Sequence, residues 1–348
     1  MGNHPLTKRL KPYISAPLTP NNIYGQTTIF FLVMLAYGPV PSRRLGRSLG
    51  INHVPPKICT YSCVYCQLGR TNSMRCERHE FYPPEEIVRE VRDQVNKTWE
   101  RGERIDYLTF VPDGEPTLDA NLGEEIRLLK PLGVRTAVLS NASLMWRDDV
   151  REDLLDADWV SLKVDAVTDE TWRKVDRPHG KLNIDDVLDG MREFAEVFEG
   201  ELATETMLVK GLNDGGEEAA RVADFLGELN PDKAYLAIPT RPPAEPWVEP
   251  PYEEDLNRAY QIFADGLRHV EYLIGYEGNA FASTGRIEED LLSITSVHPM
   301  REEGVKLLLS KSGSDWSAIE TMIEEEKLLE LQYRGKRFFM RRLPSRAE

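Results

Sequence analysis

Three cysteines, Cys59, Cys63 and Cys66, lie within eight positions of a chain that has four cysteines in 348 residues. Their Cys-x3-Cys-x2-Cys spacing lets a single loop turn three thiolates toward one centre. Thiolates are the ligands by which proteins hold iron–sulfur clusters. Three protein ligands also leave one position open, which a metal needs in order to bind and activate a second molecule. The spacing therefore predicts a metal centre with an open coordination position.

Two other interpretations of these cysteines are weaker. A closed zinc site needs a fourth protein ligand at a suitable spacing, and no second Cys-x2-Cys or His-x3-His pair follows downstream. The remaining cysteine, Cys76, stands alone. Buried structural cysteines are the other alternative, but so tight a group in a cysteine-poor chain makes them a minor one.

The residues in and around this group resemble a known superfamily. Cys59-x3-Cys63-x-Tyr65-Cys66 is similar to the motif of the radical S-adenosylmethionine (SAM) enzymes. The flanking residues 37–46 and 67–71 resemble the branch related to the tRNA wyosine-base synthases, and the resemblance runs from about Tyr37 to the C-terminus. It implies that the three cysteines hold a [4Fe–4S] cluster whose fourth iron is chelated by the amino and carboxylate groups of SAM.

The same resemblance implies an activity. The enzyme would reductively cleave SAM to a 5′-deoxyadenosyl radical and abstract hydrogen from an unidentified substrate, with a tRNA base as one candidate. An external electron donor of the ferredoxin or flavodoxin type would supply the electron, and Tyr65 would lie close to the adenine. Wyosine synthases carry a second cluster on further cysteines, which Cys76 alone cannot provide. The sequence therefore lacks the cysteines for the second cluster of the wyosine synthases.

A second motif, Asp113-Gly114-Glu115, follows an expected strand. Gly114 allows the backbone to come close to a ligand. Taken alone the motif is an ordinary turn, but its position at a strand end beside the cysteine loop favours a functional role. It resembles the Gly-Gly-Glu motif of the superfamily, which binds the methionine amino group of SAM, with Asp113 in place of the first glycine.

Polar residues also end the strands that follow, at Asn141, Lys163, Asp165 and Asn213. The amides and Asp165 could hydrogen-bond a ribose or a carboxylate of the cofactor, or they could cap helices, and the sequence leaves both open. Lys163 ends an apolar run, so it either points into the barrel or extends outward along the surface. An inward lysine could pair with a carboxylate of SAM or of a substrate, or serve as an amine, and we assign it as the catalytic candidate. His53 is predicted to be structural rather than a ligand.

From Arg47 onward, short β-rich runs alternate with amphipathic helices. The expected strands are 48–54, 107–111, 134–139, 159–164, 203–209, 233–238 and 270–276. The expected helices are 83–99, 118–132, 148–157, 183–198, 216–229 and 253–267. This alternation predicts an α/β fold of parallel βα units. Periodicity alone allows a doubly wound sheet or a partial TIM-like barrel, and both collect ligands at the carboxyl ends of the strands. The family resemblance implies the partial (βα)6 barrel.

The pattern changes after Gly285. Two expected helices, 302–309 and 316–325, precede two strands around a turn that contains Gly335. This order predicts a small winged helix-turn-helix domain. Residues 333–348 hold six basic residues against one acid, and they form the one clear basic patch of the chain, able to contact RNA or protein: Arg334, Lys336, Arg337, Arg341, Arg342 and Arg346.

We therefore predict three parts. Residues 1–36 form an N-terminal extension that is poorly ordered or precedes the natural start, for which Met34 is the candidate. Residues 37–285 form the radical SAM barrel. Residues 286–348 form the winged-helix-like domain.

Composition limits the partners and the location. The net charge of −15 means that the surface as a whole does not attract nucleic acid, so any such contact needs a local basic patch. The longest apolar run, 29–37, falls far short of the ~20 residues of a membrane span. Few cysteines in one group predict a reducing cytoplasm. The alternative function is an iron–sulfur redox sensor that binds nucleic acid through the winged helix. The enzyme must cleave SAM, whereas the sensor need not.

Overall fold

The computed structural model describes residues 34–274, 285–297 and 299–342. Most of the predicted N-terminal extension, over residues 1–33, lies outside them, as does Arg346 of the predicted basic patch. The described residues contain an eight-stranded sheet in the order β1–β2–β5–β6–β7–β8–β9–β10. Its strands are β1 (Ala36–Ser42), β2 (Gly46–Ile51), β5 (Tyr107–Phe110), β6 (Arg135–Ser140), β7 (Trp159–Lys163), β8 (Glu201–Met207), β9 (Lys233–Ala237) and β10 (Val270–Leu273).

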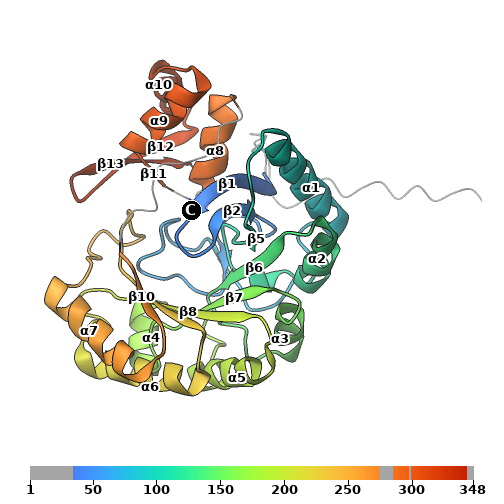
Figure 1. The fold of residues 1–348 in the computed structure, drawn as a ribbon. Helices are drawn as coiled ribbons and strands as arrows, with labels where there is room; N and C mark the ends of the chain where they lie inside the picture. The colour runs from blue at the N-terminus through green and yellow to red at the C-terminus, as the bar shows by residue number, and fades with distance from the viewer. Residues whose placement is uncertain (1–33, 275–284, 298, 343–348) are drawn as a thin grey trace, which may run out of the picture. The chain divides into compact units, whose positions relative to one another are not determined.

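The sheet is a partial barrel of parallel strands, as predicted. Every neighbouring pair from β2 to β10 is parallel, and β1 runs antiparallel to β2. Strands β1 and β10 are the two edges, so the curved sheet stays open between them (Figure 1). Ligand sites in such parallel folds lie at the carboxyl ends of the strands.

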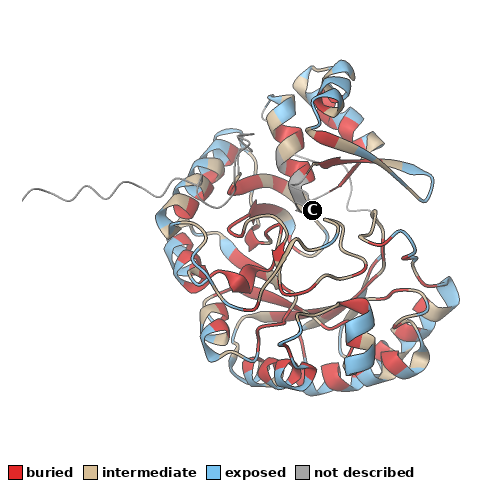
Figure 2. Cartoon of the chain, turned by 180° about the vertical axis from the view of Figure 1, so that it is seen from behind, coloured by how far each residue is buried: buried red, intermediate tan, exposed pale blue. Residues whose placement is uncertain are grey.

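Helices connect successive strands and cover the outer face of the sheet (Figure 1). They are α1 (Pro84–Glu100), α2 (Leu122–Leu129), α3 (Asp148–Leu154), α4 (Asp169–Val175), α5 (Ile184–Val197), α6 (Gly216–Leu229) and α7 (Glu253–Gly266). Helix α1 shows why they form. Pro84 stands in its first turn with Glu85 and Glu86, where a fixed φ and acidic groups favour a helix N-terminus. Its Ile87, Val91 and Val95 recur at helical spacing and are buried, while its outer side is exposed (Figure 2).

The strands alternate between two apolar layers. In β7, Val160 and Leu162 belong to the core shared with the helices, whereas Trp159 belongs to a separate cluster inside the barrel. Because side chains alternate along a strand, Lys163 lies on the same face as Trp159. Thus Lys163 points into the barrel, which decides between the two orientations that the sequence left open. In β8, Glu205 likewise shares the face of Ala203, which belongs to the same interior cluster.

Several local elements differ from the expectation. Strand β1 and helix α4 were not predicted, and residues 116–118 form the 3-10 turn η2 (Pro116–Leu118) before α2 begins at Leu122. Prolines at 39 and 41 make the sequence of β1 typical of a loop. An edge strand tolerates proline because one side of it needs no ladder hydrogen bonds.

The C-terminal elements are α8 (Ile287–Val297), β11 (Met300–Arg301), α9 (Glu302–Ser312), α10 (Ser317–Glu324), β12 (Leu328–Tyr333) and β13 (Lys336–Arg341). They form a three-stranded sheet in the order β11–β13–β12 and share a core of their own that includes Leu291, Val305, Ile319 and Phe339. The sequence predicted α9, α10 and the hairpin but missed α8 and β11. The assignment as a winged helix and the domain boundaries stay predictions. Within the described ranges, every helix is too short or too polar to cross a lipid bilayer.

Candidate active site

The cysteine loop follows β2 and runs between the short strands β3 (Ile58–Cys59) and β4 (Ser73–Met74). Backbone N–H groups of Ser62 and Val64 donate to carbonyls of Asp176 and Val175, so the loop is tied to the end of α4. All three of its cysteines are free and partly exposed. They lie close enough for the charge of each thiolate to affect the others. The predicted trio is therefore brought together.

The surroundings of these thiols suit a metal better than a nucleophile. Burial raises the pKa of Cys59 to about 12 and the pKa of Cys63 well above its ordinary value, with smaller contributions from neighbouring carboxylates. Burial also raises the pKa of Cys66. A reactive cysteine needs the opposite, a lowered pKa. Bound iron would displace the protons, because coordination deprotonates a thiol. Three free thiols grouped in one loop therefore fit a cluster.

The Asp113–Glu115 turn packs directly beneath this loop. A Cβ atom on Gly114 would lie 2.0 Å from the carbonyl oxygen of Ile58, so only glycine permits the approach. Two backbone hydrogen bonds lock the contact: Glu115 N–H donates to Ile58 at 3.1 Å, and Lys57 N–H donates to Asp113 at 2.7 Å. The second motif and the cysteine loop thus form one rigid unit.

The carboxylates of this turn differ in their partners. Glu115 is buried and accepts hydrogen bonds from Thr117, from the Ser140 hydroxyl at 2.7 Å and from the Asn141 backbone at 2.8 Å. Its side chain is therefore part of the scaffold. Asp113 accepts a hydrogen bond from Asn52 through Oδ2, while its buried Oδ1 has no hydrogen-bond partner in the described part of the chain. Burial raises the pKa of Asp113 to about 7, against the opposing effects of Asn52 and Arg341.

The two predicted amides serve as connectors rather than helix caps. Asn141 donates from Nδ2 to Thr60 Oγ1 at 2.8 Å and lies 3.4 Å from Cys59 Sγ, which joins the end of β6 to the cysteine loop. Asn213 donates both side-chain N–H groups to the carbonyls of Asp165 and Met207, each at 2.8 Å. Because those donors are occupied, Asn213 supports the ends of β7 and β8, and its predicted contact with the cofactor stays a prediction.

Lys163 is the centre of a charged group inside the barrel. Its Nζ lies 3.1 Å from Glu205 Oε1 and 3.3 Å from Asp165 Oδ1, and 5.0 Å from the centre of the Tyr65 ring. Glu205 also pairs with Arg44, and the Tyr65 hydroxyl donates to Asp165. These residues come from strand ends and loops far apart in the chain.

The same group decides the charge of Lys163. Burial lowers the pKa of the lysine, but Asp165 and Glu205 outweigh it, so the pKa is raised. Burial raises the pKa of Glu205, but Lys163 and Arg44 outweigh it and lower the pKa to about 2. Lys163 is thus held as an ammonium ion, which suits pairing with an anion and not reaction as a neutral amine. A cavity of ≈ 20 Å³ adjoins it, lined also by Tyr65, Asn141 and Asp165.

Comparison with known proteins bears on this arrangement. Residues 54–226 match the model of the radical SAM superfamily. The UPF0026 protein MJ1312 of Methanocaldococcus jannaschii is 48% identical over 314 residues, which cover 90% of this chain and 97% of that protein. The chain belongs to the UPF0026 family and to the radical SAM superfamily. As a radical SAM enzyme it uses a [4Fe–4S] cluster and SAM. Radical SAM enzymes in general receive the electron that reduces the cluster from an external donor.

More distant relatives share part of the chain. The S-adenosyl-L-methionine-dependent tRNA 4-demethylwyosine synthase TYW1 of Danio rerio is 25% identical over 193 residues, which cover 51% of this chain and 26% of that protein. The crystal structure of archaeal TYW1 is 16% identical with a TM-score of 0.44, over 64% of this chain and 72% of that one.

Sequence reasoning missed two acidic residues near Lys163, Glu205 and Asp176. Glu205 lies within strand β8, which is hydrogen-bonded to β7 on one edge and to β9 on the other. An acid in such a strand is rare unless it is paired, and that signal could have identified it. Asp176 lies at the end of the unpredicted α4, where burial and Asp165 raise its pKa well above the ordinary value.

The basic hairpin of this radical SAM enzyme is largely matched by acids. Arg337 pairs with Glu330 at 2.8 Å and with Glu302 at 3.2 Å. Other pairs join Lys336 to Glu303 at 3.9 Å and Arg342 to Glu326 at 3.6 Å. Arg341 is buried, near enough to Asp113 for the two charges to interact. These contacts reduce the charge left for phosphates, so an RNA or protein partner at the hairpin stays a prediction.

Proposed function

We propose that this chain holds a [4Fe–4S] cluster through Cys59, Cys63 and Cys66 and abstracts hydrogen from a substrate bound inside the barrel mouth. One observation carries the proposal: three adjacent thiols lie in the loop after β2, and two of them, Cys63 and Cys66, are close enough to the inward-facing Lys163 for the charges to interact. When bound and reduced, the cluster supplies the electron that cleaves SAM to methionine and a 5′-deoxyadenosyl radical.

The residues of the chain would orient the reactants. The Asp113–Glu115 turn would receive the amino group of SAM, as the matching motif does in the family, with Gly114 keeping the turn against the cysteine loop. Asn141 would hold the loop at Cys59, and Tyr65 and Asp165 would line the adjoining cavity. The Lys163 ammonium ion would attract an anionic group of SAM or of the substrate. The buried walls would keep water from the reacting atoms.

The first experiment measures cleavage. The purified chain is reconstituted anaerobically with iron and sulfide, reduced, and given SAM, with 5′-deoxyadenosine and the EPR spectrum as readouts. We expect a cluster signal that SAM perturbs, and 5′-deoxyadenosine formation that falls by at least about 100-fold in Cys63→Ala because a cluster ligand is lost. Cys76→Ala is the control, since Cys76 lies outside the cysteine loop and the charges that affect its pKa are those of Glu77 and Lys181, not those of the trio. A stable cluster that ignores SAM would instead support the sensor alternative.

For the substrate we propose an RNA base, because a relative sharing half of this chain is a tRNA-modifying synthase by name. The test adds unmodified tRNA, made by transcription, to the reduced enzyme. We expect 5′-deoxyadenosine formation to rise at least about tenfold, because binding energy from a true substrate is used to assemble the reactive geometry. Equal formation with and without tRNA would exclude this substrate and leave the cleavage activity standing. The same assay compares a ferredoxin and a flavodoxin as electron donors.

A further inference from the structure

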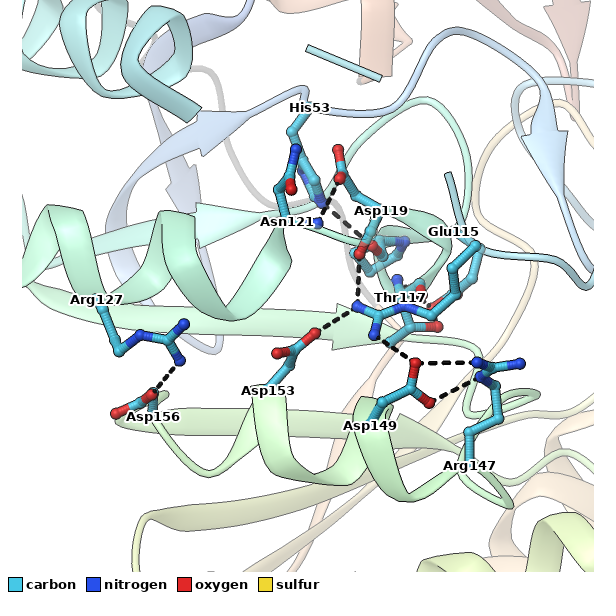
Figure 3. Close-up of polar contacts among 12 residues, drawn as sticks. His53, Glu115, Thr117, Asp119, Asn121, Arg127, Arg147, Asp149, Asp153 and Asp156 are labelled. Atoms are coloured by element: carbon cyan, nitrogen blue, oxygen red, sulfur yellow. Dashed lines mark hydrogen bonds and ion pairs between the residues drawn. The ribbon is translucent and has the colours of Figure 1, made fainter. Parts of the chain in front are cut away.

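A second group of potential metal ligands lies outside the cysteine site. His53, Asp119 and Glu125 each offer a ligand atom, and these atoms all lie within 4.8 Å of one another. His53 follows β2, Asp119 follows η2, and Glu125 lies in α2. All three side chains are fully buried. Figure 3 shows His53 and Asp119 close together, near the turn that carries Glu115 and Thr117.

The group lacks the partners that buried polar groups normally have. Among the residues that the structure describes, both carboxylate oxygens of Glu125, Oδ2 of Asp119 and Nδ1 of His53 are buried without a hydrogen-bond partner. Buried charged groups in proteins are paired or coordinate a metal. By contrast, Glu115 in the neighbouring turn is hydrogen-bonded through both of its oxygens. The unpartnered atoms come from three separate segments of the chain, and the fold brings them together.

The remaining atoms of these residues are oriented as in a metal site. His53 Nε2 lies 3.2 Å from the carbonyl oxygen of Pro116, and it donates to this oxygen in the tautomer that carries the proton on Nε2. A neutral ring has one N–H, so in that tautomer Nδ1 keeps a lone pair for a metal. Asp119 Oδ1 accepts from the Asn121 backbone at 2.8 Å, which orients Oδ2. Metal-bound histidines typically donate their other N–H to a carbonyl or carboxylate in this way.

We propose that His53, Asp119 and Glu125 bind one divalent transition-metal ion of the Mn²⁺, Fe²⁺ or Zn²⁺ type. One imidazole nitrogen with two carboxylates suits these ions better than the thiolate-binding metals. Ligands at about 2.1 Å from one ion lie within roughly 4.2 Å of each other, so binding would draw the atoms together slightly. The ion would tie α2 to the loop before the cysteines. This assignment reverses the prediction that His53 is only structural.

The test uses Mn²⁺ alone as the probe. The full chain with Cys59, Cys63 and Cys66 all changed to Ala removes the other metal centre, and EDTA strips bound ions. Free Mn²⁺ is then followed by its EPR signal during titration. We expect one Mn²⁺ per chain and binding at least about 100-fold weaker in Glu125→Gln, since even outer partners of metal ligands are worth 10- to 100-fold. Glu124→Gln, an exposed change on the same helix, is the matched control and should bind as the parent does.

Two results would overturn the proposal. One is the absence of stoichiometric binding by the parent chain while circular dichroism shows that it is folded. The other is equal Mn²⁺ affinity in folded Glu125→Gln or, should that variant not fold, in folded Asp119→Asn. Either would mean that the two carboxyl groups share protons instead of a metal. The titration needs neither the cluster nor SAM, so its outcome is independent of the proposed reaction.

Discussion

Two groups of carboxylates, one around Lys163 and one around His53, reach opposite electrostatic states. At Glu205, burial raises the pKa, but Lys163 and Arg44 outweigh it and lower the pKa to about 2. At Glu125, burial raises the pKa to about 9, and Asp119 adds to the rise. Glu125 has no cation partner among the described residues. The difference is the supply of positive charge: Lys163 and Arg44 pair with Glu205, whereas the charge of Arg78 lowers the pKa of Asp119 without reversing the rise that burial causes.

This contrast separates the roles of the two groups. A carboxylate that forms ion pairs within the protein, such as Glu205, can hold Lys163 in place inside the barrel mouth without any ligand. A carboxylate without a partner is costly to bury, and a bound divalent ion would remove that cost. The expected experiments test this contrast by removing the internal cation, the carboxylates and the added ion in turn.

The largest effect should follow removal of the internal cation. Lys163→Met would remove the ammonium group that pairs with Asp165 and Glu205. Breaking a largely buried ion pair from one side costs about 3–5 kcal/mol of stability. Urea unfolding measures the free energy of unfolding, and Lys163→Arg, which keeps the charge, is the control. A loss below about 1 kcal/mol in Lys163→Met would mean that the pairs contribute no more than exposed ones.

The next effect is a change in the acid dependence of stability. The pKa of Glu205 in the folded chain, about 2, lies below its ordinary 4.5. Its contribution is therefore present above pH 4.5 and is lost as the pH falls toward 2, amounting to about 3 kcal/mol. Glu205→Gln should unfold with a flatter pH profile between these values than the parent chain. pH profiles of equal slope in the two proteins would contradict the lowered pKa of Glu205 in the folded chain.

The third prediction concerns the group without a cation. Mn²⁺ at 100 times its dissociation constant should raise the free energy of unfolding of the cluster-free chain by about 2.7 kcal/mol. Glu125→Gln should abolish this gain, because a neutral amide replaces a carboxylate ligand. Chemical unfolding with and without Mn²⁺ measures both. A gain of the same size in Glu125→Gln would place the Mn²⁺ effect elsewhere in the chain.

The smallest effect should come from an exposed carboxylate that serves as the reference for both groups. Asp156 pairs with Arg127 at 2.9 Å and with Lys130 at 2.7 Å on the protein surface (Figure 3 shows the pair with Arg127). Water and salt screen such pairs, so Asp156→Asn should cost less than about 1 kcal/mol. Urea unfolding at low and high salt checks it. A cost matching that of Lys163→Met would remove burial as the explanation of the contrast.

Much of the fold could be predicted because it depends on local patterns. Alternating strands and amphipathic helices indicated the parallel βα units, and the cysteine spacing indicated the loop at the end of β2. Strand β1 was not predicted because its prolines are tolerated only in an edge strand, and the sequence does not show which strand lies at the edge. Asn141 directly follows β6 as predicted, whereas Asn213 lies six residues beyond the end of β8, and the hydrogen bonds of both depend on which neighbours the sheet brings to them.

The sequence by itself determined the cysteine trio, the alternation of strands and helices, and the glycine at position 114, because spacing and periodicity are properties of neighbouring residues. Only the tertiary structure decided that Lys163 faces inward, that Arg44 reaches Glu205, and that Glu125 has no such partner within the described ranges. Arg44 and Glu205 are 161 positions apart. Their contact depends on how the strands curve into a barrel and on the register between them, and no local pattern carries that information.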